Sequence, residues 1–393
     1  MGVEEGTKYL LKWCVDNGGS FLKVMMMILI CKDEDDSEPK KKQRFSYATG
    51  VYNKVFQQGG VRKMFITSMA QHVAETYDSV KAVMDLAGVK SLQFVGAMDL
   101  KALLEILGLG CGSSTCNCPF CTLAKKAYGL EQFAFMGKMR TFGRIREMAL
   151  TYMQADANDK ELHPNRRKSI SSAEWENCER MPLLDWPDEA EVLDIMATPQ
   201  LHIFTGIPCK LFSELDKVLS MVFQDWKEAK GVSPDGFGEY SFNGNSVKKL
   251  LDDIDSLEDI LDNYHGEHKT CRLIVKALRS FKKVSDSCMG MELDEDYYYH
   301  ITEFMVDYRR IFHDKVILKA HILEVHVPQF FERQKALGNC GKGLAFWTEQ
   351  PFEAAHSFWN QLWLGSNYKR DLSHPDYDSQ LKRAGVKFNS DHL

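Results

Sequence analysis

The sequence predicts a mixed α/β core followed by a long, mainly helical region. Three observations lead to this prediction: an apolar run at 24–30, an amphipathic stretch at 68–87, and an apolar run at 92–98 that ends at an aspartate. A strand, a helix and a further strand in this order are typical of an α/β core. From about Lys101 to Lys342 the apolar residues recur mostly at helical spacing.

The elements of the core follow from length and periodicity. Val24–Ile30 is a short apolar run bounded by charge, which favours a buried strand. Val61–Ser68 is a further strand candidate, and Leu92–Met98 is a third. Ser68–Ala87 predicts a helix, because its apolar side chains recur at spacings of three and four and Gly88 stops the pattern.

The helical region holds four candidate helices, and a last helix is expected near the C-terminus. The four are Leu211–Glu228, Ser246–Tyr264, Thr270–Phe281 and Asp296–His313. The last helix is predicted to run through Glu353 to about Trp363. Its apolar side consists of Phe352, Ala355, Phe358, Trp359 and Leu362. Such a stripe is typical of a packing helix.

Composition narrows the class of protein. The 393 residues suffice for two or three domains, or for one core with a large insertion. A net charge of −6 argues against a general electrostatic nucleic-acid binder, but not against a nuclease with an acidic metal site. The basic clusters at 40–44 and 166–168 are typical of solvated loops, and also of nuclear import or phosphate contacts.

Compartment is inferred from what the sequence lacks. No stretch reaches the ~18 apolar residues of a membrane span, and the first residues lack the basic start of a signal peptide. Eleven irregularly spaced cysteines in such a chain predict reduced thiols, some of them metal ligands, in an intracellular protein.

Two aspartates stand at the borders of the predicted strands. Asp16 precedes the first apolar run beside two glycines, which leaves space for a metal ion and a phosphate. An aspartate before glycine is also typical of a turn. Asp99 follows the run at 92–98, at the kind of strand end where α/β sheets assemble their sites. It is equally typical of a cap for a following helix.

A set of cysteines and histidines has the spacing of a split zinc site. Cys118 and Cys121 form a CxxC turn that can aim two thiolates at one ion. His321 and His326 would supply the other half, provided that the helix loosens at Pro328, because residues five apart do not share an α-helix face. A reduced CxxC with two unrelated histidines is the alternative, and nothing around the motif suggests a thioredoxin-like fold.

Two glutamates near the C-terminus complete the inventory of acids. Glu349 and Glu353 are four residues apart and therefore share one helix face. Thr348 is a natural helix cap, so Glu349 can be explained as a first-turn acid. Glu353 lies deeper, beside the apolar stripe.

Taken in order, these residues resemble the DDE transposases of the Transib group and the V(D)J recombinase catalytic subunit. CACTA-type transposases share a related zinc arrangement. Asp99 leads to Cys118 and Cys121 at a spacing similar to the family's. Two later tracts add to the resemblance: His321…His326-Val-Pro328…Glu332-Arg333 and Trp347-Thr-Glu-Gln-Pro-Phe-Glu353-Ala-Ala-His356.

The resemblance implies an RNase H-like catalytic core interrupted by a large, mainly α-helical, zinc-stabilised insertion. Residues 1–105 would form the first part of the core, 106–345 the insertion, and 346–393 the helix that completes the core. Asp16, Asp99 and Glu353 would hold two Mg²⁺ or Mn²⁺ ions, with Glu349 in reserve. Cys118, Cys121, His321 and His326 would hold one structural Zn²⁺.

The resemblance also implies an activity and partners. The expected reaction is metal-dependent DNA strand cleavage and transfer in the nucleus, by a homodimer acting on transposon ends and target DNA. The chain departs from the family at His356, where the family has Asn, and in lacking a dense arginine run after Trp363. Only fifteen residues precede Asp16, which suggests an N-terminal truncation and a separate DNA-binding region or accessory subunit.

Two non-enzymatic readings stay open. A domesticated, catalytically silent copy would bind DNA or protein through the retained fold. A zinc-stabilised helical interaction domain without transposase ancestry is the third reading.

Overall fold

The chain folds into two compact units, each built from segments that are distant in sequence. The computed structural model describes residues 8–18, 21–31, 64–90, 95–110, 114–129, 137–166, 169–234, 240–263, 269–339, 341–348, 352, 355, 358–360, 363 and 377–391. The sheet unit comprises 1–112, 140–197 and 346–393, and the helical unit comprises 113–139 and 198–345. A mixed sheet with a mostly helical region confirms the predicted α/β class.

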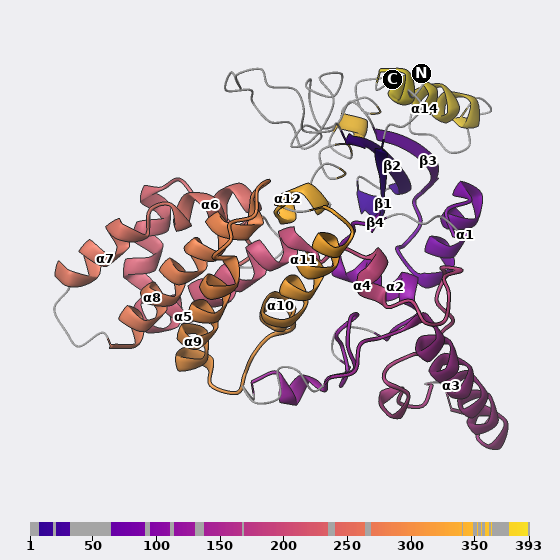
Figure 1. The fold of residues 1–393 in the computed structure, drawn as a ribbon, viewed down its shortest axis with the longest axis horizontal. Helices are drawn as coiled ribbons and strands as arrows, with labels where there is room; N and C mark the ends of the chain where they lie inside the picture. Colours follow the sequence, from indigo (N-terminus) through magenta and orange to yellow (C-terminus); the bar gives the residue numbers. More distant parts are fainter. Residues whose placement is uncertain are drawn as a thin grey trace. The chain divides into compact units, whose positions relative to one another are not determined.

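The sheet has four described strands in the order β3-β2-β1-β4 (Figure 1). β1 (Lys8–Gly18) and β2 (Phe21–Cys31) pair antiparallel, as do β2 and β3 (Met64–Gln71). β4 (Val95–Gly96) runs parallel to β1. Apolar periodicity does not delimit β1, because Lys12 and Asp16 interrupt its apolar sequence, but β1 lies within the mixed sheet expected over about Leu11 to Asp99, with Asp16 and Asp99 on neighbouring strands. Both faces of its centre are nevertheless covered, since Lys12, Trp13, Cys14 and Val15 are all buried.

The helix after β3 begins later than predicted. Residues up to Gln71 belong to the strand, and α1 runs over Tyr77–Ala87. Its start is fixed by Thr76, whose side chain accepts from the amide of Ser79 in a capping box. Its end is fixed by Gly88, which takes the left-handed φ of 67° as predicted.

Further helices of the sheet unit are α2 (Leu100–Leu107), α3 (Phe142–Leu162), α4 (Val192–Ile195) and α14 (Tyr377–Asp391). Met196 forms a parallel bridge with Gly96, so the chain after α4 extends the sheet beyond β4. α14 covers the edge strand β3: the side-chain amide of Asn389 accepts from the Ile66 amide at 3.0 Å and donates to its carbonyl at 3.1 Å.

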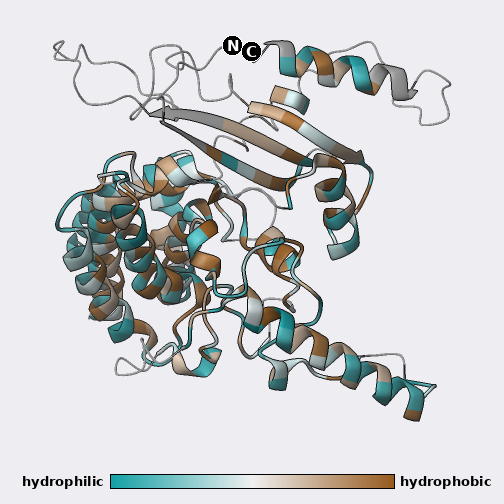
Figure 2. Cartoon of the chain, turned by 45° about the vertical axis from the view of Figure 1, so that its right-hand side comes forward, coloured by the Kyte–Doolittle hydropathy of each residue, from teal (hydrophilic) through white to brown (hydrophobic). Residues whose placement is uncertain are grey.

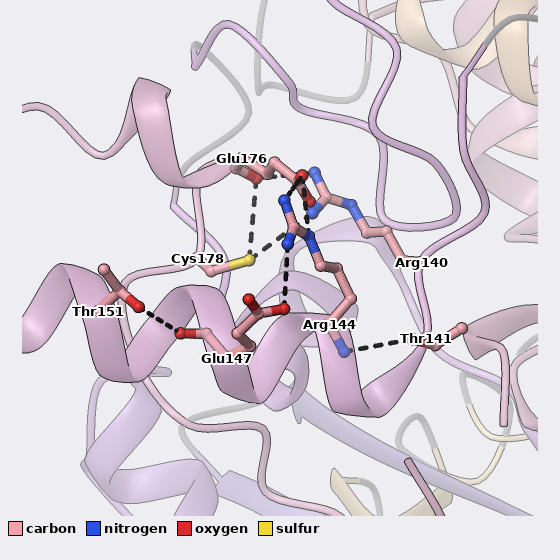
Figure 3. Close-up of polar contacts among 7 residues, drawn as sticks. All are labelled: Arg140, Thr141, Arg144, Glu147, Thr151, Glu176 and Cys178. Carbon is pink, nitrogen blue, oxygen red and sulfur yellow. Dashed lines mark hydrogen bonds and ion pairs between the residues drawn. The ribbon is translucent and has the colours of Figure 1, made fainter. Parts of the chain in front are cut away.

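A buried arginine ties the start of α3 to the segment 176–178 (Figure 3). Arg140 is fully buried and donates to the Glu176 carbonyl at 2.8 Å, and its guanidinium lies 3.7 Å from the Cys178 sulfur. Arg144 donates to the Glu176 carboxylate at 2.8 Å. Burial raises the pKa of the Cys178 thiol to about 11, so the thiol is neutral and this cluster is structural rather than reactive.

The helical unit is an assembly of amphipathic helices. Its long members are α5 (Gln200–Ala229), α6 (Gly244–Leu251), α7 (Ile254–Asn263), α8 (Lys269–Val284) and α9 (Tyr297–Phe312). The predicted helix 246–264 is two helices with a turn at Asp252 and Asp253, and the Asp253 carboxylate accepts from the Trp226 indole at 2.8 Å. Figure 2 shows hydrophobic and hydrophilic residues alternating around these helices, as expected when one face packs inward.

Two π-helices complete this unit. η5 (Ser285–Met289) ends α8, and η6 (Ile322–His326) joins α10 (Leu318–His321) to α11 (Val327–Ala336). α12 (Leu344–Trp347) follows. Such π turns often mark functional positions in helices, and η6 contains a predicted zinc ligand.

Candidate metal centres

The helical unit contains a buried Cys2His2 group. The ligand atoms of Cys118, Cys121, His321 and His326 all lie within 4.8 Å of one another. Cys118 Sγ is 3.3 Å from His326 Nε2, and Cys121 Sγ is 3.3 Å from His321 Nε2. The predicted convergence of the two pairs is confirmed, although about 200 residues separate them in the chain.

The π turn explains how two histidines five residues apart face one point. In an α-helix their directions would differ by about 140°. In η6 the Val327 amide donates to the Ile322 carbonyl, five residues back, and this wider turn returns the second ring toward the first. The ring centroids are 5.0 Å apart. The helix loosens before Pro328, as expected, but it does so through the π turn rather than by breaking: α11 follows η6 directly, with Pro328 in its first turn.

Neighbouring side chains hold both rings in place. Tyr128 stacks on His321 at 4.0 Å with an interplanar angle of 5°, and its hydroxyl donates to Asn117 at 2.7 Å. The Gln329 side-chain oxygen lies 2.9 Å from His326 Nδ1, so this nitrogen carries the proton and Nε2 is left to bind a metal. Tyr128, Asn117 and Gln329 were not predicted from the sequence, although the three-residue spacing from His326 to Gln329 is a signal that could have indicated the last.

The electrostatics of the four ligands fit a divalent metal. Burial raises the pKa of the Cys118 thiol well above its usual value. The pKa of Cys121 is lowered, chiefly by the hydrogen bond from Cys118 and further by His321 and His326. Burial lowers the pKa of His321, which keeps the ring neutral and able to ligate. Two sulfurs and two imidazole nitrogens in a closed, buried site could hold a structural zinc.

Two of the predicted acids lie at one edge of the sheet. The parallel pairing of β1 and β4 sets Trp13 opposite Gly96, and the Ala97 amide donates to the Trp13 carbonyl at 2.8 Å. Asp16 and Asp99 each follow three residues after these partners. Because the strands are parallel, both aspartates come at the same end of the sheet.

Asp99 shows the capping role that its sequence suggested, whereas Asp16 does not form the suggested turn. Asp99 caps α2, accepting from the Ala102 amide at 2.7 Å. Asp16 belongs to β1 rather than to a turn, and its cross-strand neighbour on β2 is the buried Lys23. Capping occupies one lone pair of a carboxylate that offers about four acceptor positions, so it does not prevent ligation.

A third acid, Glu75, lies near enough to both aspartates for their charges to raise its pKa, and it was not predicted from the sequence. Its side chain is 8% exposed, and its Oε2 is 2.9 Å from Lys101 Nζ. Its Oε1 is buried without a hydrogen-bond partner in the described part of the chain. Burial raises the pKa of Glu75, and the negative charges of Asp99 and Asp16 add to the rise against the opposing effect of Lys101.

The signal for Glu75 lies in the strand register. β3 ends at Gln71 opposite Phe21, the residue that also pairs with Gly18 at the end of β1. The four residues after Gln71 therefore lie at the edge that Asp16 occupies. Sequence periodicity assigned this segment to the interior of a helix, which hid the position.

Glu349 and Glu353 lie outside the described residues, so the choice between them stays a prediction. The segment before them is anchored: Lys12 on β1 is 1% exposed and donates to the carbonyls of Phe346 at 3.1 Å and Thr348 at 3.0 Å. Of the predicted apolar stripe, Phe352, Ala355 and Trp359 are buried and Phe358 is half-buried, whereas Leu362 lies outside the described residues. The Trp359 ring packs edge-on against Phe21 at 5.5 Å.

Comparison with protein-family models and with curated proteins finds no match for this chain. Among the described residues, no helix has the length and apolar character to cross a membrane.

Proposed function

We propose that this chain is the catalytic part of a DDE-type transposase or recombinase, which cuts and joins DNA strands with the help of divalent cations. The observation that supports the proposal is the meeting of Asp16, Asp99 and Glu75 at one edge of the sheet. Burial raises the pKa of Glu75, and the negative charges of Asp99 and Asp16 add to the rise. A divalent cation would offset this concentration of negative charge, and Mg²⁺ or Mn²⁺ is the match for hard oxygen ligands.

The order of the elements supports an RNase H-like core. Three antiparallel strands, a helix, a strand parallel to the first and a further helix follow in sequence, with Met196 adding a fifth position next to β4. The segments 346–393 return to the same unit after the helical unit has intervened. This is the connectivity expected of a core whose last acid is supplied by a C-terminal helix.

The residues of this chain have distinct parts in the proposed reaction. Asp16 and Asp99 would bind the ions, and Glu353, with Glu349 in reserve, would complete the set. When bound, two ions activate the attacking oxygen and stabilise the leaving oxygen in an in-line displacement at phosphorus. Glu75 would add a ligand or hold Lys101 beside the site, because its carboxylate pairs with Lys101 and its pKa is raised further by the charges of Asp99 and Asp16.

Lys12 would position the third acid. Its buried ammonium joins β1, which carries Asp16, to the carbonyls of Phe346 and Thr348 directly before Glu349. Charge-assisted hydrogen bonds of this kind are short and directional. Lys12, four residues before Asp16, thus holds the residues that precede Glu349 against the strand that carries the first acid.

Zinc at the Cys2His2 group would be structural. The group joins the segment at 118–121 to α10 and η6, which brings the two ends of the helical unit together. DNA as substrate, action as a homodimer and a nuclear location belong to the same proposal and follow from the resemblance to Transib-type enzymes.

The test is strand nicking of an oligonucleotide duplex carrying transposon ends, in Mn²⁺, with a DNA-binding region supplied in trans if needed. Asp16→Asn and Asp99→Asn should abolish nicking while leaving zinc content intact. Asp78→Asn is the matched control, because Asp78 is an exposed acid three residues from Glu75. If wild type and Asp16→Asn nick equally, the activity belongs to a contaminant, and the chain is better explained as a domesticated, silent binding protein.

A further inference from the structure

The loop after α3 carries a basic cluster followed by a serine that the proposed function does not use. The sequence is Arg166-Arg167-Lys168-Ser169-Ile170. Two arginines at the second and third positions before a serine, with an apolar residue after it, form the pattern that basophilic Ser/Thr protein kinases select. The physical reason is charge: acidic side chains in the kinase groove bind the guanidinium groups, which places the hydroxyl at the γ-phosphate.

The structure presents Ser169 in a form that a kinase can reach. Ser169 is exposed and lies outside the helices and strands. It borders an open cavity of about 430 Å³, whose lining includes Tyr152, Asp156, Lys160, Glu179 and Arg180. A site on the surface of a loop with a hollow beside it has room for the phosphate that modification would add.

Hydrogen bonds of Ser169 and Ile170 hold the described part of this loop against α3, and Ser169 itself is hydrogen-bonded to the side chains of Tyr152 and Asp156. The Ile170 amide donates to Asp156 at 2.9 Å, and the Tyr152 hydroxyl donates to the Ile170 carbonyl at 3.2 Å. Arg166 is paired with Asp159 at 3.0 Å in an exposed ion pair, which is a weak contact. These hydrogen bonds must open before Ser169 can enter a kinase groove.

We propose that Ser169 is phosphorylated by a basophilic Ser/Thr protein kinase, and that the phosphate releases the loop from α3. The Ser169 Oγ attacks the γ-phosphorus of ATP. The Oγ–P bond forms, the bond from the γ-phosphorus to the bridging oxygen breaks, ADP leaves, and the hydroxyl proton is released. This inference is independent of the proposed DNA chemistry.

The charges around the cavity explain the release. Lys160 and Arg180 balance Asp156 and Glu179 before modification. Asp156 is ionised: the hydrogen bond from Lys160 lowers its pKa, with help from the Ile170 amide and from Ser169. A phosphoserine adds about two negative charges beside this carboxylate. The phosphate repels Asp156 and competes for Lys160, so the hydrogen bond from the Ile170 amide to Asp156 breaks.

The test of the modification uses the full chain with the catalytic subunit of cAMP-dependent protein kinase and ATP, followed by peptide mass spectrometry. We expect one phosphate at Ser169. Ser169→Ala should remove it, Arg167→Gln should slow incorporation at least tenfold, and Ser171→Ala, an exposed neighbour in the same loop, should leave it unchanged. Absence of phosphate at Ser169, with a control peptide fully modified, would overturn the assignment.

The release is tested by amide hydrogen exchange before and after modification. The Ile170 amide should exchange at least tenfold faster in the phosphorylated chain, because its acceptor on Asp156 is lost. An Asp156→Asn chain should show a much smaller acceleration, because the repulsion depends on the carboxylate charge. Equal exchange in both phosphorylated and unmodified wild-type chains would refute the release.

Discussion

Replacing Cys121 by alanine removes one of the four ligands that meet in the helical unit, and its effect can be estimated. Structural zinc contributes about 10–16 kcal/mol in small zinc domains at pH 7. Divided over four ligands, one ligand is worth roughly 3 kcal/mol, which corresponds to about a 100-fold loss of affinity. Because domains are stable by only about 5–15 kcal/mol, this loss should also lower the stability of the helical unit.

The matched control is Cys116→Ala, in the same segment but outside the group of four. Zinc content by elemental mass spectrometry and competition with a chromophoric chelator give the affinity of each chain. Cys121→Ala should lose zinc to the chelator at about 100-fold lower chelator concentration, while Cys116→Ala follows wild type. Equal retention of zinc by both variants would refute the four-ligand group.

The pH dependence of zinc binding gives a second view of the same site. The raised pKa of Cys118 means that its sulfur is protonated at neutral pH before zinc binds, whereas Cys121 is already a thiolate. Zinc binding therefore releases one thiol proton, and affinity should rise about tenfold per pH unit near neutrality. The lowered pKa of His321 excludes a comparable contribution from that ring in this range. Affinity that does not change with pH would contradict this assignment of protons.

Three further predictions concern residues that support the two centres. Gln329→Leu should weaken zinc about 10- to 100-fold, measured by chelator competition, because the His326 ring loses the partner that orients it; an affinity equal to wild type would show that the ring is held otherwise. Lys12→Met should lower the nicking rate more than DNA binding, and it should lower the free energy of unfolding in urea by about 2–4 kcal/mol, because two buried carbonyls lose their donor. Lys12→Arg should recover part of the rate. If Lys12 had a purely structural role, its replacement would reduce DNA binding and nicking rate alike. Glu75→Gln should reduce Mn²⁺-dependent nicking. In metal-free buffer, however, the wild type should lose stability relative to this variant as pH rises from about 4 to 7, because folding raises the pKa of Glu75 and disfavours its ionised form. An equal difference in unfolding free energy between the two chains at both pH values would contradict this prediction.

Local patterns in the sequence were sufficient for some elements and insufficient for others. Gly88 ends its helix as predicted, and the run at 24–30 is in β2, because cap geometry and short apolar runs are local signals. The bounds of β1 could not be predicted, because Lys12 and Asp16 break its apolar pattern, and the buried Lys12 donates to carbonyls more than 300 residues away. A contact between residues so far apart in the chain cannot be predicted from the few residues around Lys12.

In both metal centres, the ligand residues could be predicted from the sequence, but the features that depend on tertiary structure could not. Cys118, Cys121, His321 and His326 could be grouped from ligand chemistry and spacing, but the device that aligns the histidines could not, since a π turn depends on packing at both ends. Asp16 and Asp99 were identified at strand ends, and the register now sets them at one edge. Glu75 could be found only after β3 was known to extend to Gln71.

Mn²⁺ binding, followed by electron paramagnetic resonance of the free ion, tests most directly whether Asp16, Asp99 and Glu75 belong to one cation site. Wild-type chain, titrated in the absence of DNA, should take up Mn²⁺ with an affinity that falls at least tenfold in Asp16→Asn and in Asp99→Asn alike, because each removes a charge from a shared site. Asp78→Asn should bind as wild type does. If all four chains leave the same amount of Mn²⁺ free at every concentration, the carboxyl groups do not form a metal centre, and the proposed DNA chemistry has no site in this chain.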